Sequence, residues 1–515
     1  NDINTLGLLK VDCLGLGMLS AIHRCFDLIK KHGGNSWTIA TIPTEDPVVY
    51  NMMGNADTVG VFQIESRAQM AMLPRLRPVC FYDLVIEVAI VRPGPIQGDM
   101  VHPYLKRRQG HEAVTYPNDA MRQVLGRTLG VPIFQEQVIK LAVVAAGFTP
   151  GEADSLRRAM GAWRRHGNLS DYEEMLVNGM RERGYPEAFA KQIYRQILGF
   201  GEYGFPEAHA ASFALLVYVS AWLKYYQPAA FTCALLNSQP MGFYAPAQLI
   251  QDVRRHGVQV KPIDVTVSDW ESTLEQSGET LALRLGLHMI NGFSQTGAAR
   301  LLNARADRAF GDLQDFAQRT RLNKTDLQAL AAANAFMALV RSHRKMAYWE
   351  VAGISPPTPI LNRTYFNEGT PMIPKATPVD DVHADYASIG LTLGPHPLAL
   401  IRPILYGLGL STREELYRQS HGQAAKVAGL VIARQRPASA NNVTFVTLED
   451  ETGNINLVVW KKIAEQYASI LLGSYLISAS GKIQREGDIL HLVTDQLIDL
   501  SYLLDNLTTQ SRDFC

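Results

Sequence analysis

The chain has 515 residues, of which 47% are hydrophobic and 19% charged, a composition that can bury large cores and excludes a chain disordered over its whole length. At roughly 150 residues a domain, this length predicts about three to four domains. Lys and Arg total 49 and Asp and Glu also total 49. The resulting zero net charge argues against a chain-wide attraction to nucleic acid or anionic membrane, so any polyanion site must be local.

The cysteines and the apolar runs limit the redox environment and the class of protein. The cysteines are odd in number and scattered, without a C-x-x-C pair, which supports neither a disulfide framework nor a zinc ribbon and fits a reducing, cytoplasmic location. The longest apolar run, 210–223, is shorter than the roughly 20 residues that span a bilayer, so we expect a buried helix there and no membrane partner. Residue 1 is Asn and no signal peptide follows it, which predicts a piece of a longer protein. The cysteines are Cys13, Cys25, Cys80, Cys233 and Cys515.

Helical periodicity dominates the chain up to about residue 265, interrupted by loops rich in Pro and Gly. The sequence Thr149-Pro150-Gly151-Glu152 has the form of a capping box with Pro at the first helical position. We therefore expect a helix that begins there and runs through Arg157 and Arg158.

The second half of the chain changes character twice. Residues 280–350 predict small helix pairs, separated by Gly292, Gly311 and Asn323. Residues 351–380 hold six prolines, too many for a helix or a central strand, and predict a linker. Beyond it, β-branched runs and a turn at Glu451-Thr452-Gly453-Asn454 predict five short strands in a small barrel. The predicted strands are Val427–Ala433, Val443–Leu448, Ile455–Trp460, Tyr475–Ala479 and Ile489–Val493.

A lysine and a carboxylate, Lys10 and Asp12, lie two residues apart near the start of the chain, in an otherwise apolar run. If this run is a strand, its period of two places both side chains on one face. The simplest interpretation is a buried ion pair. Two-metal phosphoryl transfer gathers several carboxylates around Mg²⁺, and this segment offers only one, so the spacing alone does not favour a metal site.

Residues 155–168 concentrate positive charge in an otherwise neutral chain. They contain Arg157, Arg158, Arg164 and Arg165 and no acidic residue. Seven residues are nearly two helical turns, so the two arginine pairs share a face if the helix continues past Gly161. A solvated basic face and a phosphate clamp both remain open.

Two segments place Gln and Glu beside aromatic and apolar residues, one around Gln63 and one around Gln135. Their composition predicts buried hydrogen-bonding corners. His209 lies at the start of the apolar helix, where packing or capping is its expected role. The histidines show no metal-ligand spacing, and the sequence has no G-x-x-x-x-G-K-[ST] phosphate loop.

Residues 287–302 resemble a helix-hairpin-helix, with the turn Ile290-Asn291-Gly292-Phe293-Ser294. In that motif, backbone N–H groups of a Gly-rich hairpin hold a DNA phosphate without reading sequence. Ser294 stands where a second hairpin glycine is usual, so a simple packing helix pair remains an alternative.

Taken in order, these landmarks resemble one family, the C-family bacterial DNA polymerases, which are the alpha-type subunits of the third replicative polymerase. The resemblance covers nearly the whole chain. The matching segments are LLKVDCLGLGML at 8–19, GVFQIES at 60–66, VRPGP at 91–95, YLKRRQG at 104–110, FQEQV at 134–138, AGFTPGEADSLRRAMG at 146–161, FGEYGFPEAHAASFALLVYVSAWLKYYQP at 200–228 and LGPHPL at 393–398.

The resemblance implies roles for the matching residues. Asp12 resembles the third of the family's three catalytic aspartates, which hold two Mg²⁺ ions while a primer 3′ hydroxyl attacks the α-phosphate of a dNTP. Lys10 resembles the family's phosphate-contacting lysine. Arg157 and Arg158 resemble the finger arginines that grip the triphosphate, a task suited to planar guanidinium groups.

Other residues fall in family motifs with less defined roles. The residues expected to line the fingers are Gln63, Arg92, Gln135 and His209. The resemblance implies DNA contacts for Gly292 in the helix-hairpin-helix and for Arg164 and Arg165. Phe445 and Trp460 would stack on a single-stranded template, although a role in the barrel core competes for each.

The implied fold is mainly α and multidomain, with fingers and tandem helix-hairpin-helix units followed by a C-terminal all-β OB-fold barrel. The implied boundaries are 1–17 for the end of the palm, 18–265 for the fingers, 266–350 for the helix-hairpin-helix pairs, 351–423 for the Pro-rich linker and a small connecting region, 424–500 for the OB-fold and 501–515 for the tail.

The implied function is error-prone DNA synthesis past lesions in the DNA damage response, because the chain ends in S-R-D-F plus one residue soon after the barrel. Implied partners are primer-template DNA, dNTPs, accessory mutagenesis proteins and, through them, the sliding clamp. A replicative alpha-subunit fragment and a non-catalytic DNA-binding scaffold are the alternatives. The family's Asp-x-Asp motif, which supplies the other two catalytic aspartates, lies upstream of the segment with Lys10. We therefore expect the 515 residues by themselves, without the PHP domain and most of the palm and thumb, to be inactive.

Overall fold

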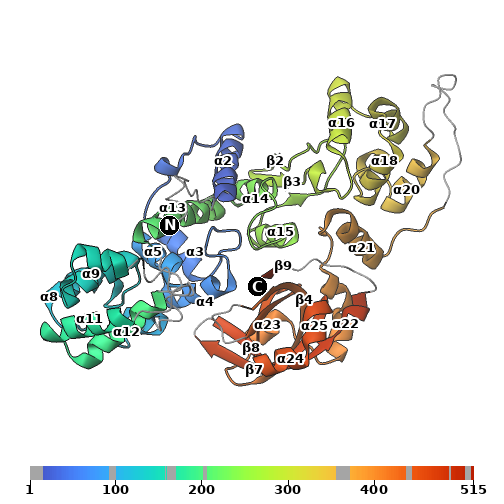
Figure 1. The fold of residues 1–515 in the computed structure, drawn as a ribbon. Helices are drawn as coiled ribbons and strands as arrows, with labels where there is room; N and C mark the ends of the chain where they lie inside the picture. Colours follow the sequence, from blue (N-terminus) through green and yellow to red (C-terminus); the bar gives the residue numbers. More distant parts are fainter. Residues whose placement is uncertain are drawn as a thin grey trace. The chain divides into compact units, whose positions relative to one another are not determined.

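The computed structural model describes residues 15–91, 100–156, 158, 170–200, 206–354, 372–436, 443–486, 489–504 and 512–514. It comprises two units, of which the first contains Asn1–His23 and Trp37–Gln227 and the second Arg24–Ser36 and Pro228–Cys515. Helices make up most of the described chain, and a barrel of strands lies near the C-terminus (Figure 1). The predicted fold class is confirmed. None of the helices in the described ranges combines the length and hydropathy that crossing a membrane requires.

Helix α13 (Glu207–Tyr226) is the long apolar helix of the first unit, and the buried helix predicted at 210–223 is confirmed. Its side chains are buried on nearly every face, so protein must surround it. Helices α3 and α5 pack against it. The helices of this unit are α3 (Pro47–Gly54), α4 (Arg67–Leu76), α5 (Phe81–Ile90), α7 (Val101–Arg108), α8 (Asp119–Leu125), α9 (Gln135–Ala146), α11 (Ser170–Glu182), α12 (Glu187–Phe200) and α13, while α2 (Leu16–Lys31) spans the unit boundary.

The predicted helix start at Thr149 is confirmed. Glu152 accepts a hydrogen bond from the Thr149 backbone N–H at 2.8 Å, and Thr149 Oγ1 accepts one from the Glu152 N–H at 3.3 Å. Residues 150–156 and 158 are helical. This reciprocal pair satisfies two N–H groups that a helix start leaves without partners.

Close packing fixes the segment just before this helix. Helix α9 ends at Gly147, whose φ of 76° favours glycine. Arg183 donates to the Ala146 carbonyl at 3.1 Å, at the same helix end. Gly179 of α11 lies so close that a Cβ there would stand 2.2 Å from the Ala146 oxygen. The α9 to α11 crossing therefore requires a residue without a side chain.

Helix α5 carries a buried acid without a hydrogen-bond partner. Glu87 is 0% exposed, and neither carboxyl oxygen meets a donor among the described residues. Burial raises the pKa of Glu87 well above its usual value, because a charge without a partner is poorly solvated in the interior. The carboxyl group is therefore neutral in the folded state over a wider pH range than in the unfolded chain.

We predict that Glu87→Gln stabilises the first unit increasingly as pH rises. The unfolded chain ionises at the ordinary pKa of Glu while the folded chain stays protonated, so wild-type stability falls above the unfolded pKa and until pH reaches the raised folded pKa. Gln keeps the shape without ionising, and its advantage should grow by about 1.4 kcal/mol per pH unit in that window. Denaturant unfolding from pH 4 to pH 8 measures the difference. The exposed Glu174→Gln is the control, and a difference for Glu87→Gln that does not change with pH would contradict the prediction.

A small three-stranded sheet in the second unit was not predicted. It contains β1 (Val260–Lys261), β2 (Thr273–Ser277) and β3 (Thr280–Arg284) in the order β1-β3-β2. The helical interpretation up to residue 265 and from residue 280 is wrong for β1 and β3. Their runs are too short for a period of two to stand out against neighbouring helical patterns. The turn at Gly278, with a φ of 63°, was the available hairpin signal.

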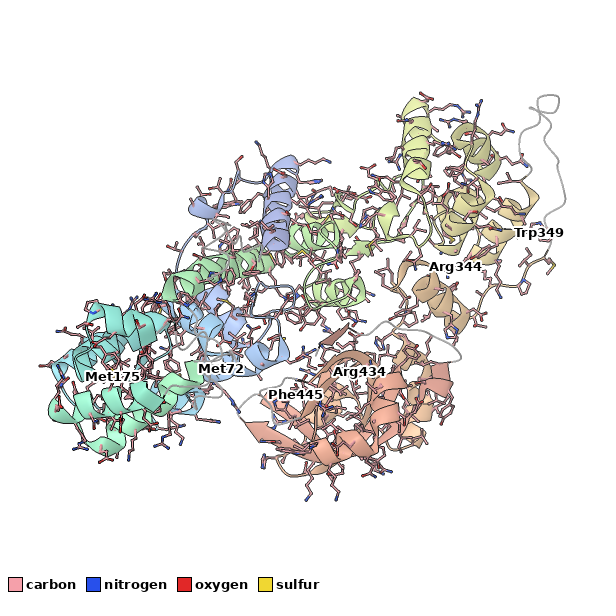
Figure 2. All side chains as sticks on the ribbon, in the orientation of Figure 1. Met72, Met175, Arg344, Trp349, Arg434 and Phe445 are labelled. Atoms are coloured by element: carbon pink, nitrogen blue, oxygen red, sulfur yellow. The ribbon has the colours of Figure 1, made fainter. Side chains whose placement is uncertain are left out.

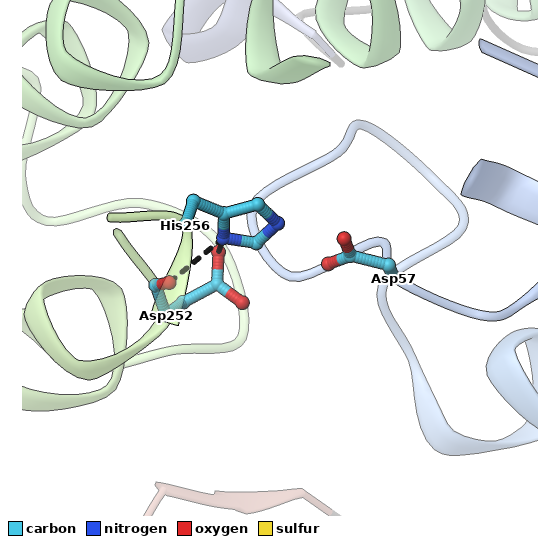
Figure 3. A group of neighbouring side chains, drawn as sticks. All are labelled: Asp57, Asp252 and His256. Atoms are coloured by element: carbon cyan, nitrogen blue, oxygen red, sulfur yellow. Dashed lines mark hydrogen bonds and ion pairs between the residues drawn. The ribbon is translucent and has the colours of Figure 1, made fainter. Parts of the chain in front are cut away.

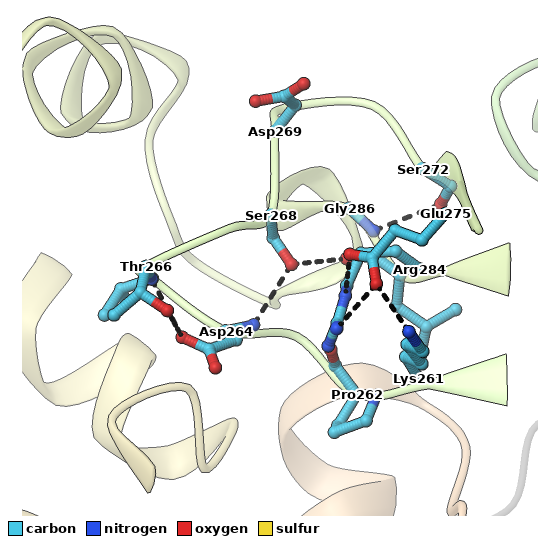
Figure 4. Close-up of polar contacts among 12 residues, drawn as sticks. Lys261, Pro262, Asp264, Thr266, Ser268, Asp269, Ser272, Glu275, Arg284 and Gly286 are labelled. Carbon is cyan, nitrogen blue, oxygen red and sulfur yellow. Dashed lines mark hydrogen bonds and ion pairs between the residues drawn. The ribbon is translucent and has the colours of Figure 1, made fainter. Parts of the chain in front are cut away.

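Ion pairs fasten the three strands together (Figure 4). Glu275 of β2 accepts hydrogen bonds from Arg284 Nε of β3 at 2.6 Å and from Lys261 Nζ of β1 at 2.9 Å. The Arg284 guanidinium, assisted by Lys261, lowers the pKa of Glu275 to about 2. Arg284 Nη1 also donates to the Pro262 carbonyl at 2.6 Å. One carboxylate, ionised at any ordinary pH, thus links all three strands.

The predicted helix pairs after residue 286 are confirmed. Asn323 caps α18 by accepting from the Asp326 N–H at 2.8 Å, and Asp312, next to Gly311, caps α17 in the same way. Short polar side chains at these positions stop one helix and start the next. The described helices from residue 228 to residue 353 are α14 (Pro228–Leu236), α15 (Pro246–Arg255), α16 (Gln295–Asp307), α17 (Leu313–Thr320), α18 (Lys324–Ala332), α19 (Met337–Val340) and α20 (Arg344–Gly353). The last five form the predicted helix pairs.

A buried arginine joins α20 to the connecting region. Arg344, labelled in Figure 2, forms an ion pair with Asp385 and donates to the Asp381 carbonyl at 3.0 Å. Both acids lie on α21 (Pro378–Ile389), which α22 (Pro397–Gly407) and α23 (Arg413–Tyr417) follow. Within the predicted linker, residues 355–371 lie outside the described residues.

The predicted barrel is confirmed. Within the described part of residues 424–499, five strands close in the order β5-β6-β8-β7-β4, with β4 returning to β5. Helices α24 (Lys461–Gln466) and α25 (Ala468–Gly473) join β6 to β7, and β9 (Arg512–Phe514) adds parallel to the end of β4. The predicted turn connects β5 to β6, with Asp450 opposite Gly453. The strands are β4 (Ala424–Gln435), β5 (Thr444–Asp450), β6 (Gly453–Val459), β7 (Leu476–Glu486) and β8 (Ile489–Asp499).

Helix α22 packs on the outside of the barrel. Leu398 and Leu405 belong to one buried apolar cluster with Leu430 of β4. Arg402 Nε and Nη2 lie 2.5 and 2.6 Å from the two carboxylate oxygens of Glu451. This bidentate pair and the apolar cluster hold the connecting region to the barrel.

Residues 449–451, which we name the acidic corner, end β5. Asp450 is fully buried, and its Oδ2 accepts from the Arg413 N–H at 2.5 Å. Its Oδ1 accepts from the N–H groups of Thr452 and Gly453 at 2.7 and 2.9 Å. A single carboxylate therefore satisfies the tight turn and the start of α23 together.

Glu449 of the acidic corner meets two other parts of the second unit. Its Oε1 accepts from Gln251 Nε2 of α15 at 2.8 Å and lies 3.3 Å from His396 Nε2. His396 Nδ1 accepts from the Leu398 N–H at 3.1 Å, so a neutral ring carries its proton on Nε2 and donates to Glu449. His396 thus caps α22 and contacts the barrel through opposite ring nitrogens.

Candidate functional site

Gly15, the first described residue of the chain, lies against helix α13 and Phe62. Lys10 and Asp12 lie outside the described residues. Gly15, with a φ of 83°, is three positions after Asp12, and a Cβ there would lie 3.3 Å from the Phe62 ring and 3.5 Å from Leu216. This spacing is tight for any side chain, and the backbone conformation favours glycine. Gly15 itself is therefore packed closely against α13 and against the loop that holds Gln63.

Residues 58–65, which we name the Gln63 corner, form a mostly buried loop. Thr58 Oγ1 donates to the Ile64 carbonyl at 2.7 Å, and the Gly60 N–H donates to the buried Glu65 carboxylate at 3.1 Å. Buried loops need such partners because their backbone cannot reach water. The predicted hydrogen-bonding corner is confirmed.

Gln63 occupies the turn of this corner in a left-handed conformation, with a φ of 60°. Non-glycine residues adopt this region infrequently and at a cost in free energy, so the surrounding contacts must hold it. The neighbouring Phe62 N–H donates to Ser220 Oγ of α13 at 3.2 Å. The backbone directly before Gln63 is therefore fixed to a buried helix.

His209 lies in the first turn of α13 and packs on an aromatic row. Its ring centroid is 4.4 Å from that of Phe213, and Phe213 meets Phe62 edge to face at 5.3 Å. Two ring contacts thus connect His209 to the Gln63 corner. The packing role expected for His209 is confirmed.

The segment around Gln135 forms the second predicted corner. Gln137 is buried, and its Oε1 accepts from the Ile133 and Phe134 N–H groups at 2.8 and 3.1 Å. Glu136 Oε2 accepts from the Glu207 N–H at 2.9 Å and so caps α13. Gln135, in the first turn of α9, is partly buried beside these two residues. Gln135 and His209 thus belong to segments that meet at the start of α13.

Within the basic stretch 155–168, the structure describes Ser155, Leu156 and Arg158. Arg158 is exposed, and its Nη2 lies 3.0 Å from Asp154 Oδ2 one turn earlier. An exposed pair of this kind contributes little to stability and leaves the guanidinium accessible. Arg92, Arg157, Arg164 and Arg165 lie outside the described residues.

The Gly292 hairpin offers fewer N–H donors than the motif predicts. Gly292 has a φ of 77°, as the turn requires. The Asn291 N–H donates to the Ser388 carbonyl at 2.8 Å, and the Ser294 N–H donates to Asp326 Oδ1 at 3.1 Å. Two backbone N–H groups of the hairpin are thus already hydrogen-bonded within the protein. The buried Asp326 carboxylate beside Ser294 would also repel a phosphate.

A cationic group that sequence reasoning missed lies at the next hairpin. Arg300 Nη1 of α16 donates to the carbonyl of Arg321 at 3.2 Å, and Lys324 begins α18 three residues later. All three side chains are exposed, and none is paired with an acid among the described residues. The signal available in the sequence was Arg321 and Lys324 around Asn323, at a predicted helix break.

The two aromatic candidates of the barrel occupy different places. Phe445 (Figure 2) is partly buried on β5, on the face opposite Val446 and Leu448 of the barrel core. Trp460 is 55% exposed at the start of α24. A role in the barrel core is therefore wrong for both residues, because the Phe445 side chain projects away from the core and the chain leaves the sheet at Trp460. Both rings remain compatible with stacking.

His256, directly after α15, lies close to Asp252 in the last turn of that helix. His256 Nδ1 is 2.8 Å from the Asp252 carbonyl and 3.8 Å from its carboxylate (Figure 3). Asp57, also drawn there, belongs to the first unit, where its carboxylate is paired with Lys224.

Three family models match parts of this chain. Residues 18–184 match the bacterial DNA polymerase III alpha subunit finger domain. Residues 257–346 match a helix-hairpin-helix motif, and residues 425–500 match an OB-fold nucleic acid binding domain. The matches follow the order of the finger helices, the helix pairs and the barrel.

Curated relatives align with the whole chain. It is 56% identical over 533 residues to an error-prone DNA polymerase of Methylococcus capsulatus, 58% identical over 515 to one of Alkalilimnicola ehrlichii and 53% identical over 517 to one of Pseudomonas aeruginosa. In each case 100% of this chain aligns with 50 or 51% of the relative. The chain thus spans about half the length of the curated relatives that it matches.

Proposed function

We propose that this chain forms the fingers, helix-hairpin-helix and OB-fold portion of an error-prone DNA polymerase of the bacterial polymerase III alpha-type family. The observation that carries the proposal is the alignment of the whole chain with relatives of that name. The proposed reaction adds dNTPs to a primer on damaged templates, in the cytoplasm. The proposed domain boundaries are those given from the sequence.

The proposed chemistry needs a negatively charged residue close to the primer end. When bound, Mg²⁺ would stabilise the charge that develops on the transferred phosphate and activate the primer hydroxyl. Asp12 offers a hard carboxylate oxygen, the ligand type that Mg²⁺ prefers. Lys10 would contact phosphate from the same face. We place the remaining carboxylates in the half of the relatives that this chain does not span.

The finger residues would hold the nucleotide. Arg157 and Arg158 are proposed to grip the triphosphate, and the exposed guanidinium of Arg158 supports this role. Gln63, Gln135 and His209 are proposed to line the fingers, together with Arg92. The residues next to Gln63 and Gln135 are hydrogen-bonded to α13, the helix that carries His209, and this supports one shared site.

The second unit would hold DNA. The helix pairs are proposed to grip the duplex backbone, and Phe445 and Trp460 to stack on the single-stranded template. Gly292 would shape its hairpin, and Arg164 and Arg165 would add backbone contacts from the fingers. Accessory mutagenesis proteins and, through them, the sliding clamp are the proposed protein partners.

Primer extension tests the proposed function. A full-length polypeptide that contains these 515 residues should extend a primed template with dNTPs and Mg²⁺, and it should insert opposite an abasic site more readily than a high-fidelity polymerase does. Failure to incorporate any nucleotide on undamaged primed DNA would overturn the proposal.

A double variant tests where the helix pairs contact DNA. We predict that Arg321→Gln with Lys324→Gln weakens binding to primed DNA of any sequence and lowers the slope of log affinity against log salt by about 0.9 for each phosphate that the protein no longer neutralises. The reason is that these cations stand together without a paired acid among the described residues. Filter binding or fluorescence anisotropy at several salt concentrations measures both effects.

The matched control removes the same charge from α15, through Arg254→Gln with Arg255→Gln, which are both exposed. An equal decrease of affinity in the two double variants would show a general charge effect and contradict the assigned DNA contact.

A further inference from the structure

Lys224 is a buried lysine near the end of α13. It is 2% exposed, and its Nζ lies 3.1 Å from Asp57 Oδ1 and 3.0 Å from the Val59 carbonyl. Moving an ammonium group out of water costs several kcal/mol unless partners replace its hydration. The Asp57 carboxylate and the Val59 carbonyl are two such partners; Asp57 directly precedes the Gln63 corner and Val59 lies within it.

Ser220 lies one turn before Lys224 on the same face of α13. It is fully buried, and its Oγ accepts from the Phe62 N–H at 3.2 Å and donates to the Leu216 carbonyl at 2.7 Å. Residues four apart on a helix project side by side. Lys224 therefore fixes the start of the Gln63 corner, and Ser220 fixes the residue directly before Gln63.

Gln63 needs this support because of its backbone. Its φ of 60° is unfavourable for a residue with a side chain, and the Gln63 corner contains a second left-handed residue at Gly60. The alternative conformations of such a loop differ by only a few kcal/mol. Contacts between the Gln63 corner and a rigid buried helix can therefore select one loop conformation. An ion pair elsewhere in the core would not affect this choice.

The Gln63 corner also touches the proposed catalytic segment. The Phe62 ring lies against Gly15, three residues after Asp12, and against the aromatic row that leads to His209. A shift of the Gln63 corner would therefore move Gln63 and disturb the packing of Phe62 against Gly15. Displacements of about 1 Å near reacting groups can lower rates about 100-fold.

We propose that Lys224 and Ser220 are positioning residues of the polymerase reaction, which act by holding Gln63 in its left-handed conformation. This inference rests on the proposed function. It predicts that the removal of Lys224 lowers nucleotide addition through Gln63, and not through a general decrease of stability.

A double-mutant cycle in the full-length polypeptide tests the proposal. Steady-state kcat and KM for dNTP incorporation are measured for the wild type, Lys224→Met, Gln63→Ala and the double variant, together with thermal unfolding. Lys224→Met should lower kcat/KM about 10-fold or more in the wild-type background. It should have little further effect when Gln63 is already Ala, although it should lower the melting temperature in both backgrounds.

Val219→Ala is the matched control, because Val219 is buried in the same helix and has no assigned role in the site. It should lower the melting temperature without showing coupling to Gln63. If Lys224→Met does not fold, Ser220→Ala enters the same cycle in its place, since it removes the acceptor of the Phe62 N–H and leaves the ion pair of Lys224 intact.

The outcomes are distinct. Effects of Lys224→Met and Gln63→Ala that multiply independently, or a decrease of stability without a decrease of kcat/KM, would overturn this inference while the wild type still extends primers. A wild-type polypeptide that adds no nucleotide would overturn the proposed function itself, and with it the positioning role.

Discussion

Replacing Asp12 with Asn in a full-length polypeptide is expected to abolish primer extension while binding to primed DNA stays close to that of the wild type. Asn has nearly the same shape as Asp but lacks the negative charge, and its amide offers one neutral oxygen to a cation that prefers carboxylates. Phosphoryl transfer depends on charge stabilisation at the transferred phosphate, so the removal of a charged ligand affects the chemical step far more than substrate binding. Rapid-quench incorporation assays with Mg²⁺ measure the effect, and the rate should fall by about 1,000-fold or more.

The position of Asp12 sharpens this experiment. Gly15 packs against Phe62 and Leu216, so a misfolded segment would also disturb the Gln63 corner. Circular dichroism and thermal unfolding separate such a defect from the removal of a charge. Asp27→Asn, an exposed change on α2, removes the same charge from a residue with no assigned role in the site and should retain activity. Activity of Asp12→Asn close to that of the wild type would remove Asp12 from the metal site.

Replacing Asp450 with Ala should destabilise the barrel by about 3 to 5 kcal/mol, the cost usual for removing one partner of a buried charged network. Asp450 is fully buried and serves the N–H groups of Arg413, Thr452 and Gly453. The Ala variant leaves these donors buried without an acceptor. Asp450→Asn should lie between the wild type and the Ala variant, because its amide group would turn a donor toward at least one of these N–H groups.

Hydrogen exchange of amides in β4 to β8 measures this effect, because it reports unfolding of the barrel without requiring the whole chain to unfold together. The exposed Asp495→Ala in β8 is the control and should change protection by less than about 0.5 kcal/mol. Equal protection in Asp450→Ala and wild type would show that water or a rearranged turn replaces the carboxylate.

Several features were readable from the sequence because they depend on neighbouring residues. The capping box at Thr149, the buried helix around 210–223 and the turn between β5 and β6 each follow from local patterns, and the structure confirms them. The order of motifs likewise indicated the succession of fingers, helix pairs and barrel, which the matching family models follow. Local propensity and motif order survive without knowledge of long-range contacts.

The sequence misjudged features whose outcome depends on distant partners. The strands β1 and β3 were missed because short strands gain stability from pairing across the sheet, here through Glu275 with Lys261 and Arg284. The Gly292 hairpin looked open to phosphate, but Asp326 lies 32 positions beyond Ser294 in sequence and binds its N–H. A role in the barrel core was predicted for Trp460, but the chain leaves the sheet at this residue and begins α24.

The sequence by itself therefore determined the order of the matched domains and the residue types available for phosphate chemistry. Only the tertiary structure decided which residues that are distant in sequence contact one another. Lys224 and Asp57 are separated by 167 positions, and Ser220 and Phe62 by 158, yet they form adjoining contacts on one face of α13. Such contacts depend on the packing of a helix that is buried nearly all round, and no local pattern carries the register in which a distant loop settles against it.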